Sequence, residues 1–432
     1  MLEVLRYVVT NLRANKLRSF LTMFGILWGV ISVVILSATG EGFRRGNDKV
    51  LSELGKNIAI VWGARTGMQA GGERAGRQVL LTVADARALE RESTMIAVVS
   101  AEIQRGAISV KSLYNAAAIT VDGIEPQYQD IRTIDIDRGR PFGDADEAEA
   151  RRVAILGVDS TTQLFGTRNS IGETLKLNGI PYTVVGRIRK KDQDSDYNGR
   201  DNDKVFVPFS AMARDFPRAD MPDGILSEII VAPRPEVVAQ LPYILNNRTG
   251  RIEDIDWPLA REIRRVIARQ HGFDPADRDA LQIWDTSLES IMFERMIQTM
   301  KNFFSIVGLV TLSLGGLGVM NIMLVAVRER TREIGIRKAL GATTSQIQRQ
   351  FFLEGFVLTM LSGTAGFLIG IGLCVLVNFA PMPTRFQGMI LTWQAGAGAI
   401  LALVVVGVVT STYPARRAAQ LPPVEALRFE SS

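Results

Sequence analysis

The chain has 432 residues, of which 47% are hydrophobic, and its formal net charge is +5. A single Cys and a single His exclude an intrachain disulfide, a cysteine-based zinc site and a centre built on several histidines. We therefore expect neither a metal site nor a catalytic centre. Acidic residues outnumber basic ones between residues 41 and 300, so the basic excess lies in the flanking segments. A nucleic-acid binder would gather its basic residues on one folded face, and we expect no nucleic-acid partner.

Four uncharged apolar runs are long enough to cross a membrane. A spanning helix needs about 20 mostly apolar residues. The runs cover residues 20–38, 302–327, 355–383 and 388–415. Four such runs favour membrane spans over buried core helices. The first run exceeds the ~7–15 apolar residues of a signal-peptide core, which predicts an uncleaved anchor.

Basic residues indicate the orientation of these spans, because Lys and Arg are retained on the cytoplasmic side. One cluster precedes the first span, one lies between the second and third, and one follows the fourth. Representative members are Arg13, Lys16, Arg18, Arg332, Arg349, Arg416, Arg417 and Arg428. The pattern predicts that both termini are cytoplasmic and that residues 41–300 lie outside.

The block outside the membrane has the pattern of a mixed α/β domain. Runs rich in Ile and Val predict strands near residues 57–61, 118–121, 153–156, 205–207 and 228–231. Residues 174–185 predict a hairpin around Asn178-Gly179, since both residues accept a positive φ. Residues 259–269 predict an amphipathic helix ended by Gly272. We expect two subdomains, with residues of about 139–224 inserted into the outer one.

A loop rich in aspartate, residues 192–203, has part of the spacing of a calcium loop. Tyr197 stands where an EF-hand needs Gly, and Asp203 stands where it needs the longer Glu. We interpret the segment as a solvated loop.

The segment that enters the second span predicts one long helix. Thr286 and Glu289 have the spacing of a capping box. No Pro follows before Val327, so a helix from about residue 287 would reach ~60 Å at 1.5 Å per residue. Such a rod can carry movement between the two sides of a membrane.

Small residues in the second span predict close approach to another helix. The candidates for a subunit interface are Gly308, Gly315, Gly316, Gly318 and the polar Asn321. Ordinary packing within one chain is the alternative, and the sequence leaves it open.

Several motifs resemble one family of membrane proteins. The cytoplasmic loop reads VRERTREIGIRKALGA from Val327 to Ala342, followed by QFFLE from Gln350 to Glu354. Further motifs are NKLRSFLTMFGI at 15–26, GGLGVMNIM at 315–323, YPARRAA at 413–419 and PVEAL at 423–427. The middle block adds GRPF at 139–142, LFG at 164–166 and IGE at 171–173. Together they resemble the FtsX/MacB-type permeases of ABC transporters.

The resemblance implies an α-helical membrane protein with four transmembrane helices and a large extracytoplasmic α/β domain like the MacB periplasmic core domain. We expect a cytoplasmic amphipathic segment at 1–19 and spans at 20–40, 301–327, 351–379 and 390–413. We expect the α/β domain at residues 41–300 and the coupling segment at 328–350. A short outer loop is expected at 380–389 and a cytoplasmic tail at 414–432.

In this family the segment between spans two and three docks on the ATPase. The residues that the resemblance assigns to this contact are Glu329, Arg330, Glu333, Ile334, Arg337, Lys338, Ala339 and Leu340. Acidic residues come early in the segment and basic ones late, around an apolar face that could fit a groove on another protein. A basic loop lying on anionic lipid is the alternative.

The sequence contains no P-loop. Its one Gly-Lys pair, Gly55-Lys56, is followed by Asn57, and Val50 stands where the motif needs its first Gly. We expect this chain to bind no cofactor itself and ATP with Mg to be held by a separate ABC ATPase subunit.

The resemblance implies a permease in the bacterial inner membrane that transmits ATP-driven change to its outer domain for efflux. Its expected partners are the ATPase, a second copy or a homologous permease, a periplasmic adaptor and membrane lipid. Two alternatives stay open, namely an FtsX-like regulator of cell-wall hydrolases and a lipoprotein-releasing permease. The substrate is not readable from the sequence.

Overall fold

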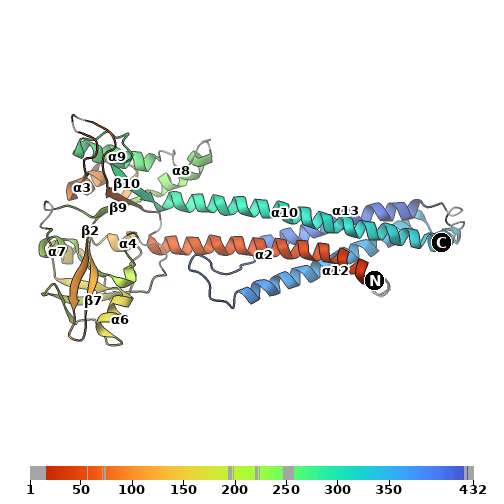
Figure 1. Ribbon diagram of the computed structural model, residues 1–432, viewed down its shortest axis with the longest axis horizontal. Helices are drawn as coiled ribbons and strands as arrows, with labels where there is room; N and C mark the ends of the chain where they lie inside the picture. The colour runs from red at the N-terminus through yellow and green to blue at the C-terminus, as the bar shows by residue number, and fades with distance from the viewer. Residues whose placement is uncertain are drawn as a thin grey trace. The chain divides into compact units, whose positions relative to one another are not determined.

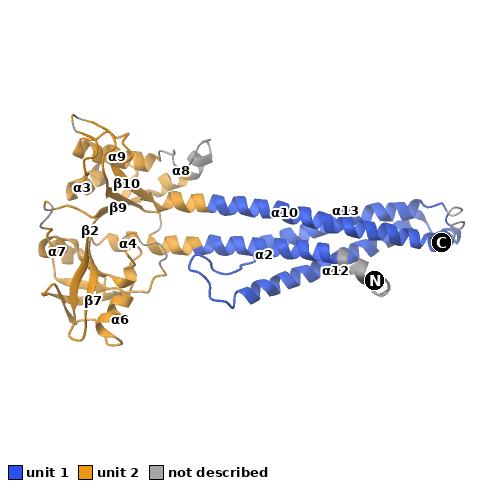
Figure 2. Ribbon diagram, viewed as in Figure 1, with its two compact units in different colours: residues 1–46, 294–432 blue, residues 47–293 orange. Residues whose placement is uncertain are grey.

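The computed structural model describes residues 16–55, 57–70, 72, 74–192, 197, 199–218, 222, 224–246, 257–422 and 426. Two compact units result (Figures 1 and 2). The helical unit comprises residues 1–46 and 294–432, and the α/β unit comprises residues 47–293.

The described residues of the helical unit form five helices. They are α2 (Lys16–Leu54), α10 (Thr286–Glu329), α11 (Thr331–Ala339), α12 (Thr344–Val377) and α13 (Trp393–Gln420). All except α11 are long and apolar enough to cross a membrane. Their outward side chains are also apolar: Ile306 and Leu368 are both 63% exposed. Such a surface is unfavourable in water and suits lipid. Helices α2 and α10 each continue into the α/β unit.

Two of these helices extend past the expected ends of their spans. Helix α2 continues to Leu54, well beyond residue 40. Helix α13 continues through Pro414 to Gln420, although Pro lacks the N–H that would complete one helical hydrogen bond. The following turn is held by buried Ala415, Ala418 and Ala419. Helix α12 ends at Val377 and is capped by Asn378.

One ten-stranded sheet organises the α/β unit, in the order β10-β1-β9-β2-β3-β8-β5-β7-β4, with β6 paired to β2 and β7. The strands are β1 (Ala59–Gly63), β2 (Ile96–Lys111), β3 (Ala116–Ile124), β4 (Ile136–Gly139), β5 (Val153–Leu156), β6 (Thr174–Leu177), β7 (Ile180–Ile188), β8 (Val205–Pro208), β9 (Glu228–Pro233) and β10 (Leu281–Asp285). Most pairs are antiparallel, whereas β3–β8 and β5–β7 are parallel.

Helices and loops cover both faces of this sheet. The helices are α3 (Val83–Glu92), α4 (Tyr128–Ile131), α5 (Asp144–Ala148), α6 (Val158–Phe165), α7 (Phe209–Asp215), α8 (Pro235–Asn246) and α9 (Pro258–His271). Because side chains alternate along a strand, neighbouring residues enter different cores. Ile229 and Val231 belong to the larger core, and Ile230 belongs to the smaller one.

The local sequence predictions in this unit are confirmed. Leu177 pairs with Ile180 across the hairpin, and Asn178 and Gly179 have φ of 47° and 89°. Helix α9 stops at Gly272, which has φ of 66°. The strands between residues 136 and 208 lie together at one end of the sheet, so the two expected subdomains share a single sheet.

The predicted capping box at the start of α10 is wrong in its residues, although the helix does begin at Thr286. Asp285 is the cap: its Oδ1 accepts hydrogen bonds from the N–H groups of Ser287 (2.8 Å) and Leu288 (3.2 Å). Glu289 instead accepts a bond from the Trp284 indole. Thr286 is engaged with Ile58, beside strand β1.

Part of the aspartate-rich loop lies outside the described residues, since Asp194, Asp196 and Asn198 are not among them. Asp192, at its start, pairs with Lys49 of α2, with 2.6 Å between Oδ2 and Nζ.

Candidate coupling site

The loop between the second and third spanning helices folds into the short helix α11. It follows α10 directly, and a turn at Gly341, with φ of 97°, separates it from α12. Thr343 caps α12 in a reciprocal bond with Gln346. The segment is thus a helical hairpin of defined shape rather than a loose basic loop.

An ion pair fixes the corner between α10 and α11. Arg330 Nη1 lies 3.1 Å from Glu354 Oε2 on α12, and the two side chains are 15% and 6% exposed. Gln350 Nε2 donates to the other oxygen of Glu354. A pair this well covered holds its geometry better than a solvated one. Arg330 therefore positions the segment within the chain.

Two further predicted contact residues are also used internally. Ile334 is 2% exposed and packs in the apolar cluster that contains Ile347 and Phe351. Lys338 Nζ donates to the carbonyl oxygens of Ala419 (2.6 Å) and Leu421 (2.9 Å). These carbonyls end α13, where a cation is favourable. Ile334 and Lys338 thus anchor α11 to its own chain, and their contact with an ATPase stays a prediction.

The other face of α11 is exposed. Ile336 is 45% exposed and Leu340, one turn later, is 83% exposed. Glu333 and Arg337 are about half covered and pair with each other, with 2.5 Å between Oε1 and Nη2. Arg337 also donates to Gln350 Oε1 at 2.7 Å. Glu329 and Ala339 are exposed beside this surface.

We call Ile336, Leu340, Glu333 and Arg337 the outer face of α11. The apolar face expected from the sequence comprised Ile334, Ile336, Ala339 and Leu340. The structure keeps Ile336 and Leu340 exposed and buries Ile334.

The glycines of α10 mostly face helices of the same chain. A Cβ on Gly315 would lie 2.6 Å from the backbone of Gly25 and Ile26 in α2. One on Gly316 would lie 2.6 Å from Thr410 Cγ2 in α13, and one on Gly308 would meet Val33 of α2. These three glycines therefore pack against helices of the same chain. Asn321 is exposed and Gly318 is partly exposed. For all five residues the subunit interface stays a prediction.

A buried ionic network in the α/β unit was not predicted from the residue pattern. Arg132, which follows α4, is 1% exposed and lies 3.2 Å from Asp201 Oδ1. Lys191 Nζ lies 2.8 Å from the other oxygen of Asp201. Burial raises the pKa of Asp201, but the charges of Arg132 and Lys191 outweigh it, so the pKa falls below its usual range.

A second part of this network lies across strands β2, β3 and β8. Lys204 Nζ is 2.7 Å from Asp122 Oδ2, and both side chains are almost fully buried. Glu102 is also buried, and burial, with the charges of Glu228 and Asp122, raises its pKa well above the ordinary value. The charged side chains thus lie along neighbouring strands in the middle of the sheet.

These features define a membrane protein in which the long helix α10 connects an α/β domain with a helical hairpin, formed by α11 and α12, that is anchored within its own chain. Residues 19–241 match the family model of the MacB-like periplasmic core domain, and residues 305–423 match that of the FtsX-like permease C-terminal region. The chain therefore belongs to the FtsX/MacB-type family of ABC transporter permeases.

Two kinds of relatives, a permease and combined ATP-binding/permease proteins, are similar along the whole chain. The uncharacterized ABC transporter permease YknZ of Bacillus subtilis is 30% identical over 435 residues, covering 100% of both chains. The macrolide export ATP-binding/permease protein MacB of Bdellovibrio bacteriovorus is 30% identical over 441 residues. This chain spans 62% of the length of that MacB and 60% of the MacB of Chlorobaculum tepidum, with 31% identity to the latter.

Two solved structures also match. The periplasmic region of MacB from Actinobacillus actinomycetemcomitans is 16% identical, with a TM-score of 0.40, covering 57% of this chain and 95% of that one. The extracellular domain of a YknZ transporter from Gram-positive bacteria is 19% identical, with a TM-score of 0.39, covering 53% of this chain and 100% of that one.

Proposed function

We propose that this chain is the transmembrane subunit that couples a separate ABC ATPase to the α/β domain, and that the transporter works in export. ATP and Mg bind to the ATPase subunit, and a second permease copy completes the complex. The observation that carries the proposal is the outer face of α11 at the end of α10. The helix is anchored within the chain by the polar contacts of Arg330 and Lys338 and by the buried side chain of Ile334. Ile336 and Leu340 stay exposed.

The anchoring makes α11 a transmitter and not only a docking site. The ion pair of Arg330 ties it to α12, and the bonds of Lys338 tie it to the end of α13. A push on its outer face therefore reaches α10, α12 and α13 together. Helix α10 has 44 residues, which is about 66 Å at 1.5 Å per residue, and it reaches the sheet of the α/β unit at β10.

Substitutions on the outer face test the docking step. Leu340→Glu should leave the fold intact, because surface substitutions change stability by only about 0.5 kcal/mol. If Leu340 fills a groove on the ATPase, the charge should cost at least ~2 kcal/mol, or about 30-fold in affinity. Glu333→Lys should cost ~2–5 kcal/mol if the carboxylate meets a buried basic partner. It should cost only ~0–1 kcal/mol if the carboxylate serves solely its exposed pair with Arg337.

The measurement is copurification of the ATPase that accompanies the wild-type chain, together with its stimulated ATP hydrolysis. Gln420→Glu is the matched control, because it adds a carboxylate at the exposed end of α13. Normal copurification and normal stimulation in both Leu340→Glu and Glu333→Lys would refute the assignment. Normal copurification with lost stimulation would keep the site and assign it to transmission.

The same proposal places α11 and both termini in the cytoplasm and the α/β unit outside the inner membrane. It is supported by the basic residues around α11 and at the end of α13. In a Cys374→Ala background, a cysteine at Gln163 should react with an impermeant thiol reagent added to whole cells, and one at Thr343 should not. The reverse pattern would overturn the orientation.

A further inference from the structure

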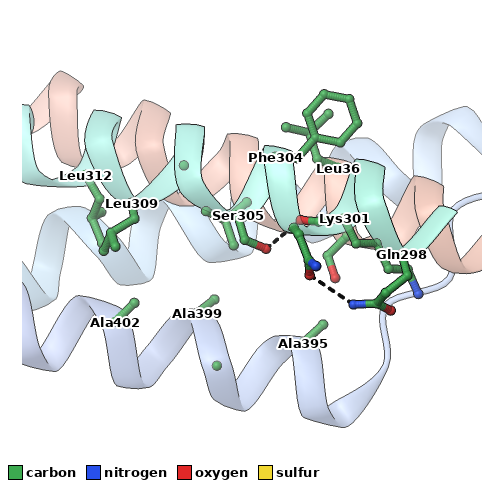
Figure 3. A pocket seen from close by; sticks show the side chains of 15 residues that line it. Leu36, Gln298, Lys301, Phe304, Ser305, Leu309, Leu312, Ala395, Ala399 and Ala402 are labelled. Carbon is green, nitrogen blue, oxygen red and sulfur yellow. Dashed lines mark hydrogen bonds between the residues drawn. The ribbon is translucent and has the colours of Figure 1, made fainter. Parts of the chain in front are cut away.

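A cavity of about 460 Å³ opens between α2, α10 and α13, all within the helical unit (Figure 3). Its size is that of a pocket for a small molecule, typically ~300–1,000 Å³. Figure 3 shows Ala399 and Ala402 of α13 on the side of the cavity facing Leu309 and Leu312 of α10, with Ala395 toward Lys301. The alanines leave the space open because their side chains are too short to reach the facing helix.

The two ends of the cavity differ in chemistry. One end is lined by apolar or small residues: Gly308, Leu309, Leu312, Ala399 and Ala402. The other end carries the polar residues Ser37 on α2 and Gln298, Lys301, Asn302 and Ser305 on α10, next to the apolar Leu36 and Phe304. The polar groups occupy earlier turns of α10 than the apolar ones. The cavity therefore has the character of a site for an amphiphile, with a polar head at one end and an apolar tail at the other.

Three basic side chains surround one carboxylate next to the polar end. Lys301 Nζ lies 3.2 Å from Glu41 Oε2 on α2, and the stem of Lys301 crosses Gly40, where a Cβ would lie 2.9 Å from its Cε. Glu41 also pairs with Arg44 at 2.7 Å and Arg45 at 3.0 Å. Three cations around one carboxylate leave an excess of positive charge. An anionic head group would be attracted to this end.

We propose that the cavity holds one acyl chain of an anionic phospholipid, with the lipid phosphate at Lys301. The charge excess favours a head group with net negative charge over a zwitterionic one. The cavity lies between helices long and apolar enough to span a membrane, so membrane lipid can reach it. A helix of a second copy fits the cavity less well than an acyl chain. Such a helix is about 10–12 Å wide, and one turn of it would fill the whole space. The proposal does not depend on coupling to an ATPase.

Lipid retention by the purified full-length chain tests the site. Native mass spectrometry would compare added phosphatidylglycerol with phosphatidylcholine of the same acyl chains. We expect about tenfold tighter retention of phosphatidylglycerol, which corresponds to ~1.4 kcal/mol. Lys301→Gln should abolish this preference, and the control Arg295→Gln, on the same helix but outside the lining, should keep it. Equal retention of the two lipids by the wild-type chain would overturn the proposal.

A second variant tests the apolar end. Ala399→Phe should fill the cavity and reduce retention of both lipids about tenfold, or ~1.4 kcal/mol. Leu401→Phe is the control, because Leu401 is 66% exposed on the same helix. Equal retention by these two variants would overturn the site. A cysteine at Ser305, in a Cys374→Ala background, should give no crosslink between copies in the membrane, and an efficient crosslink would assign the cavity to a second copy. If Ala399→Phe does not fold, the lipid preference of Lys301→Gln still tests the proposal.

Discussion

A close backbone contact between the first two spanning helices should make Gly315 intolerant of even one methyl group. A Cβ on Gly315 would lie 2.6 Å from Gly25 C and from Ile26 N. A Cβ on Gly25 would in turn lie 3.0 Å from Gly315 Cα. Both neighbours are backbone atoms, so no side chain can rotate away. Gly315→Ala therefore forces α2 and α10 apart.

The magnitude follows from two opposing effects. Ala is favoured over Gly in a helix by about 0.5–1 kcal/mol. Overpacking a well-packed core costs about 1–3 kcal/mol. The separation would also loosen Ile26 and Leu312, which are 0% and 2% exposed. We expect Gly315→Ala to lower the free energy of unfolding of the helical unit by up to about 2.5 kcal/mol, which is the overpacking cost less the gain in helix propensity.

Unfolding of the full-length chain in mixed micelles, followed by far-UV circular dichroism, measures this change. Gly372→Ala is the matched control, because it lies in spanning helix α12 and its Cβ would meet nothing within 4 Å. That variant should be as stable as the wild type or slightly more so. If Gly315→Ala were as stable as Gly372→Ala, the close contact of α2 and α10 would be refuted.

Two predictions concern the α/β unit, measured by urea unfolding of residues 47–293. Glu102 has a raised pKa in the folded state and ~4.5 in the unfolded state. Its contribution to stability is thus complete below pH ~4.5 and falls by up to ~1.4 kcal/mol per pH unit above it. Glu102→Gln, which carries no charge, should remove this slope. Thr286→Val should cost ~1–3 kcal/mol, because the buried Ile58 N–H loses its acceptor, the Thr286 hydroxyl at 2.9 Å. Thr286→Ser, which keeps the hydroxyl, should cost less.

Different results would contradict each of these two predictions. The exposed Glu236→Gln is the control for Glu102→Gln, and equal pH slopes in the two variants would show that Glu102 ionises normally. Equal stability of Thr286→Val and Thr286→Ser would show that the hydroxyl bond to Ile58 does not hold the start of α10.

Sequence and structure agree where the deciding interactions are local. The four spans follow from apolar length, since a helix satisfies its own backbone groups in lipid. The hairpin at Asn178-Gly179 and the stop of α9 at Gly272 follow from backbone conformations that few residues adopt. Each signal lies within one short segment. The motifs of the coupling segment were equally local, and they located α11 correctly between α10 and α12.

The partners of individual residues in the candidate site could not be predicted in the same way. Ile334 and Ile336 are two residues apart and equally apolar, yet Ile334 is 2% exposed and Ile336 is 45% exposed. Which of them faces inward depends on where α12 and α13 lie, because those helices supply the cluster around Ile334. The acceptors of Lys338 are carbonyl groups 81 and 83 residues away. Backbone carbonyls leave no trace in a sequence pattern.

By itself, the sequence determined the class of this protein: four apolar spans, a long second helix and an α/β domain between the first two spans. These properties come from hydrophobic length and residue spacing, which are set along the chain. Only the tertiary structure decided which surfaces are used internally. It turned Gly315 toward Gly25 of α2, and it buried Arg132, Asp201 and Lys204 together. Such contacts join segments far apart in sequence, where periodicity and local propensity carry no information about the neighbour.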